Sequence, residues 1–341
     1  MKRLINILSL TLGLILLCIS ADIYAAGPSA GSFQKRGVDE TVRRGDPARY
    51  PSFSYIYKHL PNQPVNVFYY VPTTGDQKEM PVLFVLSGAQ RVGNGELNPW
   101  QLLAERYGIV VINPQFTKEY YPSNAYQFGN VAVSKGSSKI NKKNKWVYNI
   151  VEELFDYYLK ATGSKAKGYY LFGHSAGGQF VGRMVLMLPK ARYIKAVAAN
   201  PSAWTWADET GLKAEDGTVF GWPYSVMGTP SGKKSVLKKV LSRKLYIHIG
   251  TQDIGTKSLD RSAGANAQGS RRYDRALNYY DACVAKAKEL GVDLGFELAV
   301  VQGTRHSTLQ AVYGYPDPDR TKTDKEDLGE NSAFKLLFCK D

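Results

Sequence analysis

The chain has 341 residues, 44% of them hydrophobic, and a formal net charge of +14 at pH 7. A chain of this length can bury a large core, and it fits one α/β domain of about 270 to 300 residues. The positive charge favours contact with anionic surfaces or polymers without identifying a partner. The spacings typical of nucleic-acid-binding modules are absent, so we expect no nucleic acid among its partners.

The N-terminal residues 1–25 have the pattern of a secretory signal peptide. Two basic residues precede an apolar run from residue 4 to residue 19, and alanines follow it. This run is shorter than the ~20 residues that a membrane-spanning helix needs. We therefore expect cleavage after Ala25 or Ala26 and a secreted or periplasmic protein.

Residues 26–63 are expected to form a polar, partly irregular N-terminal arm with one short hairpin strand at 52–57. A single domain is expected to fill residues 64–341. Within it, residues 201–232 are rich in Trp, Gly and Pro and lack periodicity, which is typical of a lid or a binding loop. Residues 134–145 form a basic loop of low complexity.

Segments typical of strands and of helices alternate along the rest of the chain. The expected strands are 65–71, 82–86, 109–112, 169–172, 194–199, 245–249 and 295–301. The expected helices are 100–107, 147–158, 176–188 and 272–290. This alternation predicts an α/β fold, and the all-apolar run 109–112 is typical of a parallel strand that is buried on both faces.

The segment Gly173-His174-Ser175-Ala176-Gly177 joins an expected strand to an expected helix. It has the pattern of a nucleophile elbow, in which glycines flank the serine because a Cβ would not fit there. We therefore expect Ser175 to be the nucleophile and the backbone N–H of Ala176 to donate to a developing oxyanion. The same spacing occurs at 27–31, but no strand precedes it and we assign it no role.

A serine nucleophile needs a base, and the chain offers four histidines: His59, His174, His248 and His306. The side chain of His174 leaves the turn in another direction, His248 lies inside a strand, and His59 precedes the core sheet. His306 follows the last strand at its carboxyl end, where sheets of this kind place their active sites. We therefore expect His306 to be the general base.

The acid of the triad is expected between the serine and the histidine in chain order. Asp253 comes directly after the strand 245–249 and leaves the same edge of the sheet. Asp260 is the alternative, seven residues further along in a loop whose path the sequence does not define. We favour Asp253, whose carboxylate would orient the imidazole and stabilise its protonated form.

A second oxyanion donor is expected in the loop after the strand 82–86. In that loop Gly88 permits a turn. The backbone N–H of Ala89 is the best candidate for the donor, and that of Gln90 is the alternative.

From about residue 81 to residue 307 the chain resembles the α/β-hydrolase superfamily. Within it, the chain is similar to secreted esterases of the polyhydroxybutyrate depolymerase and feruloyl esterase type. The resemblance is carried by the elbow segment 173–180, by the turn 250–253, and by Gly303 with His306. It implies a mostly parallel central sheet with helices on both faces.

The resemblance also implies a serine carboxylic ester hydrolase that forms an acyl-enzyme intermediate and needs no cofactor. The expected substrate is an ester, either a small molecule or a polymer. Ser87 stands where histidine is usual in the oxyanion loop of the family. A peptidase of the same fold remains an alternative because one triad serves both acyl transfers, and so does a binding protein with an inactive hydrolase fold.

Three tryptophans, Trp204, Trp206 and Trp222, lie in the insert together with Phe220 and Tyr224. Substrate pockets are commonly lined by aromatic side chains with few polar groups. We therefore expect the three tryptophans to contact substrate, although the same residues would also serve to pack the loop.

Two cysteines, Cys283 and Cys339, remain after removal of the signal peptide. An even pair in an oxidising compartment can form a disulfide, and we expect a bridge that fastens the C-terminal tail. The acidic residues Asp317, Asp319 and Asp324 lack the ligand spacing of a calcium loop, so we expect no metal site there.

Overall fold

The computed structural model describes residues 33, 34 and 50–340. The predicted signal peptide at 1–25 and the second Gly-x-Ser-x-Gly segment at 27–31 lie outside these residues. Among the residues described, no helix is both long and apolar enough to cross a membrane.

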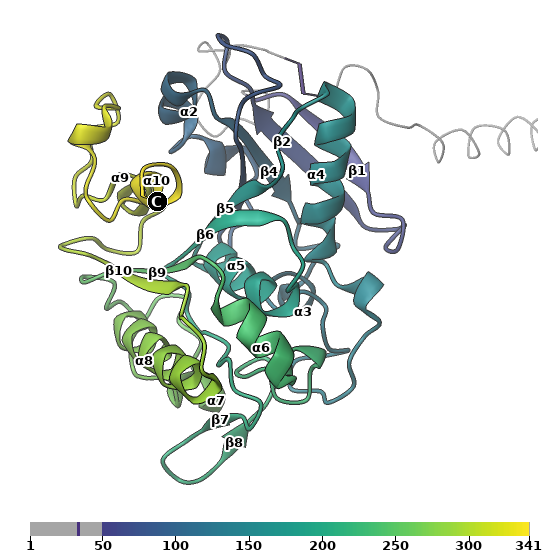
Figure 1. Ribbon diagram of the computed structural model, residues 1–341, viewed down its shortest axis with the longest axis vertical. Coiled ribbons are helices and arrows are strands. Elements are labelled where there is room, and N and C mark those ends of the chain that lie inside the picture. Colours follow the sequence, from purple (N-terminus) through teal and green to yellow (C-terminus); the bar gives the residue numbers. More distant parts are fainter. Residues whose placement is uncertain (1–32, 35–49, 341) are drawn as a thin grey trace, which may run out of the picture.

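An eight-stranded sheet forms the centre of the molecule (Figure 1), with the spatial order β1-β2-β4-β3-β5-β6-β9-β10. The strands are β1 (Ser52–Ile56), β2 (Pro64–Tyr70), β3 (Val82–Leu86), β4 (Val110–Gln115), β5 (Tyr169–His174), β6 (Tyr193–Ala199), β9 (Leu245–Gly250) and β10 (Phe296–Val301). β1 and β2 are antiparallel to their neighbours, and the six strands from β4 to β10 run parallel. The predicted mostly parallel sheet is therefore confirmed.

Helices cover both faces of this sheet (Figure 1). One face carries α4 (Asn149–Thr162), α5 (Ala176–Met187), α6 (Lys234–Leu241) and α8 (Arg272–Leu290). The other face carries α2 (Gln101–Tyr107), α9 (Thr308–Tyr313) and α10 (Ala333–Phe338). Because side chains alternate along a strand, Phe84 of β3 joins the first core and Val85 joins the second.

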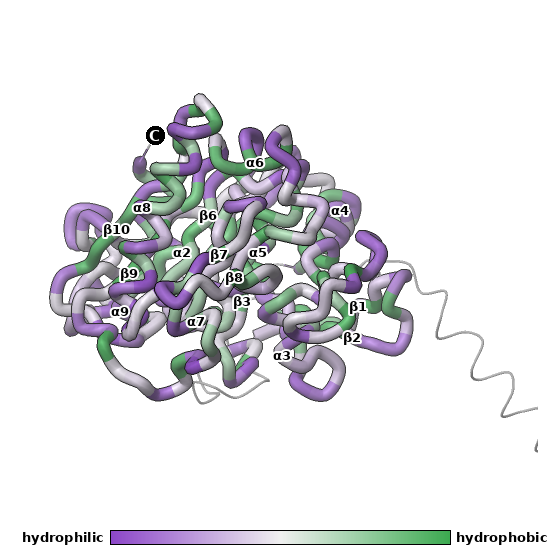
Figure 2. The backbone as a smooth tube through the Cα atoms, turned by 90° about the horizontal axis from the view of Figure 1, so that it is seen from below, coloured by the Kyte–Doolittle hydropathy of each residue, from purple (hydrophilic) through white to green (hydrophobic). Residues whose placement is uncertain are grey.

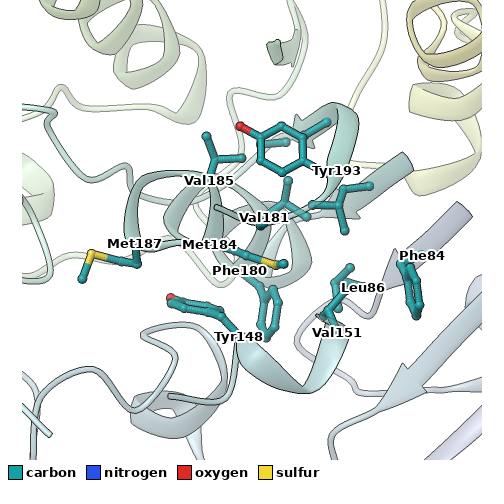
Figure 3. Packing of buried hydrophobic residues seen from close by; sticks show 14 of the residues in the cluster. Phe84, Leu86, Tyr148, Val151, Phe180, Val181, Met184, Val185, Met187 and Tyr193 are labelled. Carbon is teal, nitrogen blue, oxygen red and sulfur yellow. The ribbon is translucent and has the colours of Figure 1, made fainter. Parts of the chain in front are cut away.

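Helix α5 is buried over its whole length. Figure 3 shows Phe180 of this helix beside Tyr148, and Val185 on the side of Tyr193. The rings of Phe180 and Tyr148 meet edge to face with their centroids 4.8 Å apart. Burying a phenylalanine side chain stabilises the fold by about 1.5–3 kcal/mol. The helix that begins directly after Ser175 is therefore held rigidly by the core.

Part of the predicted arm packs on the main body. β1 forms the antiparallel edge of the central sheet. Phe33 is 1% exposed, and its ring packs against those of Phe53, Tyr69 and Tyr158. The sheet therefore begins with β1, at the position of the hairpin strand that we expected at 52–57.

The insert 201–232 is folded although it lacks periodicity. It contains a small antiparallel hairpin of β7 (Leu212–Lys213) and β8 (Val219–Phe220). Figure 2 shows hydrophilic residues on many of the outer loops and hydrophobic residues in the interior. Of the remaining short helices, α3 (Ser123–Tyr126) lies in the connection from β4 to α4, and α7 (Ala263–Asn266) lies in the connection from β9 to α8.

The predicted bridge between Cys283 and Cys339 is wrong, because both are free cysteines. Cys283 is buried on α8, in the core on one face of the sheet. Cys339 is exposed directly after α10, whose apolar side chains belong to the core on the other face. The sheet therefore lies between the two residues, and pairing requires Cα atoms within about 7 Å of each other.

Candidate active site

Ser175 lies in a sharp turn between the end of β5 and the start of α5. Its backbone has φ 57° and ψ −115°, in the left-handed region that residues with a Cβ rarely adopt. The flanking glycines make this turn possible. A Cβ at Gly173 would lie 2.2 Å from the carbonyl oxygen of Gly177, and a Cβ at Gly177 would lie 2.1 Å from that of Leu86.

The structure brings Ser175, His306 and Asp253 into one line of contacts. Nε2 of His306 is 2.9 Å from Oγ of Ser175. Nδ1 of the same ring is 2.7 Å from Oδ2 of Asp253. Ser175 follows β5, Asp253 follows β9 and His306 follows β10. All three therefore lie at the carboxyl ends of the strands, the edge at which sheets of this kind hold their active sites. The ring nitrogens therefore bridge a hydroxyl and a carboxylate.

The carboxylate of Asp253 has two further partners that the sequence patterns did not indicate. Asn200 donates from Nδ2 to Oδ2 at 2.6 Å. Arg272 forms an ion pair with Oδ1 at 3.3 Å, and both side chains are at most 1% exposed. Arg272 also donates to the carbonyls of Gly255 and Lys257. This arginine therefore fixes both the aspartate and the loop that follows it.

The alternative acid, Asp260, lies elsewhere. Its carboxylate accepts hydrogen bonds from the hydroxyl and the backbone N–H of Ser262. It also accepts a hydrogen bond from the Tyr224 hydroxyl and pairs with Lys135 at 3.4 Å. The structure brings Asp253, and not Asp260, to His306.

The loop after β3 faces Ser175. Ala89 and Gln90 both line the cavity that contains Ser175. The N–H of Gly88 donates to Oε1 of Glu96 at 3.0 Å, so this donor is already engaged. The backbone with positive φ in this loop belongs to Arg91 (57°). Gly88 is not among the residues with positive φ, so its backbone conformation does not require a glycine.

Two buried contacts hold the start of this loop. The hydroxyl of Ser87 lies 3.2 Å from the amide nitrogen of Asn113, and the carbonyl of Ser87 accepts a hydrogen bond from Tyr126 at 2.6 Å. The Arg91 guanidinium donates to two backbone carbonyls and stacks 3.6 Å above the ring of Tyr126.

Ala176 provides the first N–H of α5, which has no partner within the helix.

The cavity at Ser175 has a volume of about 510 Å³. Its ionisable lining residues are Glu96, His174, Asp253, Lys257, Arg272, Arg305 and His306. Lys257 and Arg305 are exposed and form no ion pair within the described part of the chain. Burial raises the pKa of the Glu96 carboxyl to about 7, against the opposing effect of the hydrogen bond from Gly88. The rim of the cavity is therefore positively charged.

The other histidines have surroundings of their own. His174 is buried, its ring centroid lies 4.5 Å from that of His306, and burial lowers its pKa well below the usual value. His248 is buried in β9, where Nε2 lies 3.1 Å from the carbonyl of Asn331 and burial lowers the pKa to about 4. His59 lies near Asn144.

The three tryptophans are not among the residues that line the cavity at Ser175. Trp204 is 2% exposed and stacks on the ring of Tyr279, with centroids 4.6 Å apart. Trp206 packs partly buried against the same ring. Trp222 lines a separate cavity. Trp204 and Trp206 therefore pack the insert onto α8, and the expected contact of the three tryptophans with substrate stays a prediction.

No group of three or more His, Cys, Asp or Glu side chains in the described residues is arranged to hold a metal ion. The side chain of Asp319 accepts hydrogen bonds from the N–H and the hydroxyl of Thr321, within its own loop.

The chain resembles known proteins both in sequence and in structure. A model of the family described as "Putative esterase" matches residues 59–283. The structure of poly(aspartic acid) hydrolase-1 from Sphingomonas sp. KT-1 is 30% identical, with a TM-score of 0.69 over 76% of this chain and 95% of that one. LpqC, a poly(3-hydroxybutyrate) depolymerase from Bordetella parapertussis, is 28% identical, with a TM-score of 0.68 over 76% and 86%. No curated protein sequence matches the chain.

Proposed function

Because the chain belongs to the esterase family and has the α/β-hydrolase fold, we propose that it is a serine hydrolase that cleaves carboxylic esters through an acyl-enzyme. The observation that carries the proposal is the line of contacts from Ser175 through His306 to Asp253, with distances of 2.9 and 2.7 Å. Both lie within the range in which a proton can pass between hydrogen-bonded groups.

In the proposed first step, Oγ of Ser175 attacks the ester carbonyl carbon while Nε2 of His306 accepts the hydroxyl proton. The tetrahedral intermediate then collapses, the C–O bond to the alcohol breaks, and His306 gives its proton to the departing oxygen. In the second half, water attacks the acyl carbonyl carbon while His306 accepts its proton. The bond to Oγ of Ser175 then breaks, His306 returns the proton to Oγ, and a carboxylic acid leaves. Asp253 holds the ring with Nε2 toward the serine and stabilises the imidazolium.

The developing negative charge on the carbonyl oxygen needs hydrogen-bond donors. We propose the backbone N–H groups of Ala176 and Ala89 for this role, with Gln90 as the alternative to Ala89. The N–H of Ala176 lies at the N-terminus of α5, where the helix dipole favours negative charge. Removing one such donor in other enzymes typically costs a factor of 10²–10³ in kcat, so the contribution of each is large.

We propose that the substrate is an ester with several repeat units. The two similar structures are named for the hydrolysis of polymers. Lys257 and Arg305 place positive charge at the rim of the cavity, where hydrolysis would produce a carboxylate. The same cations favour a second candidate function, the hydrolysis of amide bonds in an acidic polymer.

We propose further that the protein is exported, since residues 1–25 have the pattern of a signal peptide. N-terminal sequencing of the protein recovered from outside the cytoplasm tests this, and a new N-terminus at residue 26 or 27 is expected. A mature N-terminus at Met1 would contradict it.

Assays of the purified protein with p-nitrophenyl acetate, a 3-hydroxybutyrate oligomer and poly(aspartic acid) test the proposed activity. Turnover of the two esters is the expected result. Turnover of poly(aspartic acid) alone would favour the second candidate, and turnover of none would indicate an inactive hydrolase fold.

A further inference from the structure

A second cavity, of about 570 Å³, lies between the basic loop and the insert. Its walls come from residues 135–140 and 219–228. They are mainly apolar or aromatic, with side chains from Ile140, Val219, Phe220, Trp222, Tyr224 and Met227. We call it the aromatic cavity. None of its lining residues belongs to the cavity at Ser175.

The two cavities are adjacent along the loop after β9. Ser258 lines the cavity at Ser175. Asp260, two residues later, accepts a hydrogen bond from Tyr224 at 3.1 Å and pairs with Lys135 at 3.4 Å, and both partners line the aromatic cavity. Two residues of chain span at most about 7 Å. The loop 258–260 therefore borders both cavities.

The strand order also places the two cavities at the same edge of the sheet. The basic loop follows β4 and the insert follows β6, and these strands lie on either side of β3 and β5. Ser175 follows β5 directly. The walls of the aromatic cavity therefore leave the sheet at its carboxyl edge, where Ser175 also lies.

The aromatic wall is fixed by backbone hydrogen bonds. The N–H of Trp206 donates to the carbonyl of Tyr224, and that of Val226 donates to the carbonyl of Trp206. The hydroxyl of Ser225 donates to the carbonyl of Phe220 at 2.8 Å. A wall that is ordered in advance loses little conformational entropy when a ligand binds.

The chemistry of the aromatic cavity differs from that of the cavity at Ser175. Its one lining cation, Lys135, is already paired with Asp260, whereas Lys257 and Arg305 at the other cavity have no ion pair in the described residues. Apolar walls with balanced charge favour an uncharged, apolar segment of ligand. A chain of short hydroxyacid esters has this character along its length and exposes a carboxylate only where it ends or is cleaved.

We infer that the aromatic cavity binds the apolar repeat units next to the scissile bond of an oligomeric hydroxyacid ester whose carbonyl lies at Ser175. This inference rests on the proposed function and specifies its substrate class. Binding energy from repeat units remote from the reacting bond can be used to orient that bond, so a substrate that reaches the aromatic cavity should be cleaved more efficiently than one that does not.

Two variants and a matched control test the inference in the full chain. Ser138 lies in the exposed part of the basic loop and lines the aromatic cavity, so Ser138→Trp fills it from the surface. Phe220→Ala removes one aromatic ring from its wall. Ser134→Trp places the same indole four residues earlier, at an exposed position outside the lining. The readout is kcat/KM for a 3-hydroxybutyrate tetramer divided by kcat/KM for p-nitrophenyl acetate.

We expect Ser138→Trp and Phe220→Ala to lower this ratio by about tenfold, a common effect of lost apolar contacts in a substrate pocket. Ser134→Trp should leave the ratio within about twofold of wild type. An unchanged ratio in Ser138→Trp would overturn the inference, even if Phe220→Ala fails to fold. The inference would also be overturned if Ser138→Trp lost turnover of poly(aspartic acid) but kept turnover of the tetramer. If the wild-type protein cleaves neither ester, the proposed function itself is wrong. If it cleaves p-nitrophenyl acetate and the ratio is unchanged in Ser138→Trp, only the inference about the aromatic cavity is wrong.

Discussion

Arg272 and Asp253 form an ion pair in which neither side chain is more than 1% exposed. The arginine holds Oδ1 of the carboxylate, and the other oxygen, Oδ2, lies 2.7 Å from His306. A carboxylate buried without a partner would favour its protonated form, which cannot stabilise an imidazolium. The arginine therefore gives this buried carboxylate a charged partner in the place where the proposed mechanism requires an acid.

This pair predicts a large effect of Arg272→Gln. The substitution leaves a buried carboxylate without its cation, which typically lowers the free energy of unfolding by about 3–5 kcal/mol. Urea denaturation measures the loss, and kcat for p-nitrophenyl acetate should fall as well. Arg271→Gln is the matched control, because Arg271 is exposed and pairs with Asp274 on the surface. Equal midpoints for the two variants would contradict the prediction.

The proposed nucleophile is tested by Ser175→Ala. We expect ester turnover to fall by roughly 10⁴- to 10⁶-fold, as when the nucleophile of a triad is removed. The fold should persist, since the hydroxyl contributes little to packing. Ser29→Ala, in the second Gly-x-Ser-x-Gly segment, should leave turnover unchanged. Ester turnover measures the activity of each variant, and circular dichroism checks that it is folded. A Ser175→Ala protein that is folded and active would exclude Ser175 as the nucleophile.

The proposed acid is tested by Asp253→Asn and Asp260→Asn. Asparagine at 253 would stabilise the wrong tautomer of His306, and kcat for p-nitrophenyl acetate should fall by about 10²- to 10⁴-fold. Asp260 binds Ser262, Tyr224 and Lys135, so its substitution should cost this small substrate far less. The reverse ranking of the two variants would assign the acid to residue 260.

The parts of the site that could be predicted depend on local patterns. An apolar strand, a Gly-x-Ser-x-Gly turn and a helix follow one another without interruption around Ser175. Asp253 and His306 each come a few residues after an apolar strand. Since the carboxyl ends of parallel strands meet at one edge of the sheet, chain order alone brings these three positions together.

Asn200 and Arg272 could not be predicted in this way. They reach Asp253 across 53 and 19 residues of chain, and no periodicity relates those positions. The positions of the tryptophans in the insert could not be predicted for a similar reason. An aromatic-rich loop can line a pocket or pack on a helix, and the choice depends on partners such as Tyr279, which lies far along the chain.

Glu96 predicts a pH dependence of stability. Its pKa of about 7 in the folded protein exceeds the usual value of 4.5, so the folded state binds this proton more tightly than the unfolded state. The free energy of unfolding should therefore fall as the pH rises from about 4.5 to 7, through this group alone. Glu96→Gln removes the ionisation and should make the protein more stable than wild type at pH 8.

Urea denaturation at pH 4.5 and at pH 8 checks this expectation. The comparison is the difference between Glu96→Gln and wild type at each pH, because other groups, His248 among them, titrate in the same interval and cancel in the difference. If the difference is the same at both pH values, the pKa of the Glu96 carboxyl is not raised in the folded protein.

The two cysteines should react at very different rates. Cys339 is exposed after α10, whereas Cys283 is buried beside Tyr279 and burial raises the pKa of its thiol to about 12. The thiolate is the reactive form, so Cys283 should be inert in the folded protein and become reactive on unfolding.

A thiol-labelling assay of the mature chain without reductant checks this. We expect one equivalent of thiol to react without denaturant and two equivalents to react in denaturant. Cys283→Ala should keep the fast equivalent and Cys339→Ala should remove it. No labelling of the unreduced, denatured protein would instead require a disulfide, and with it a path for the C-terminal tail around the sheet.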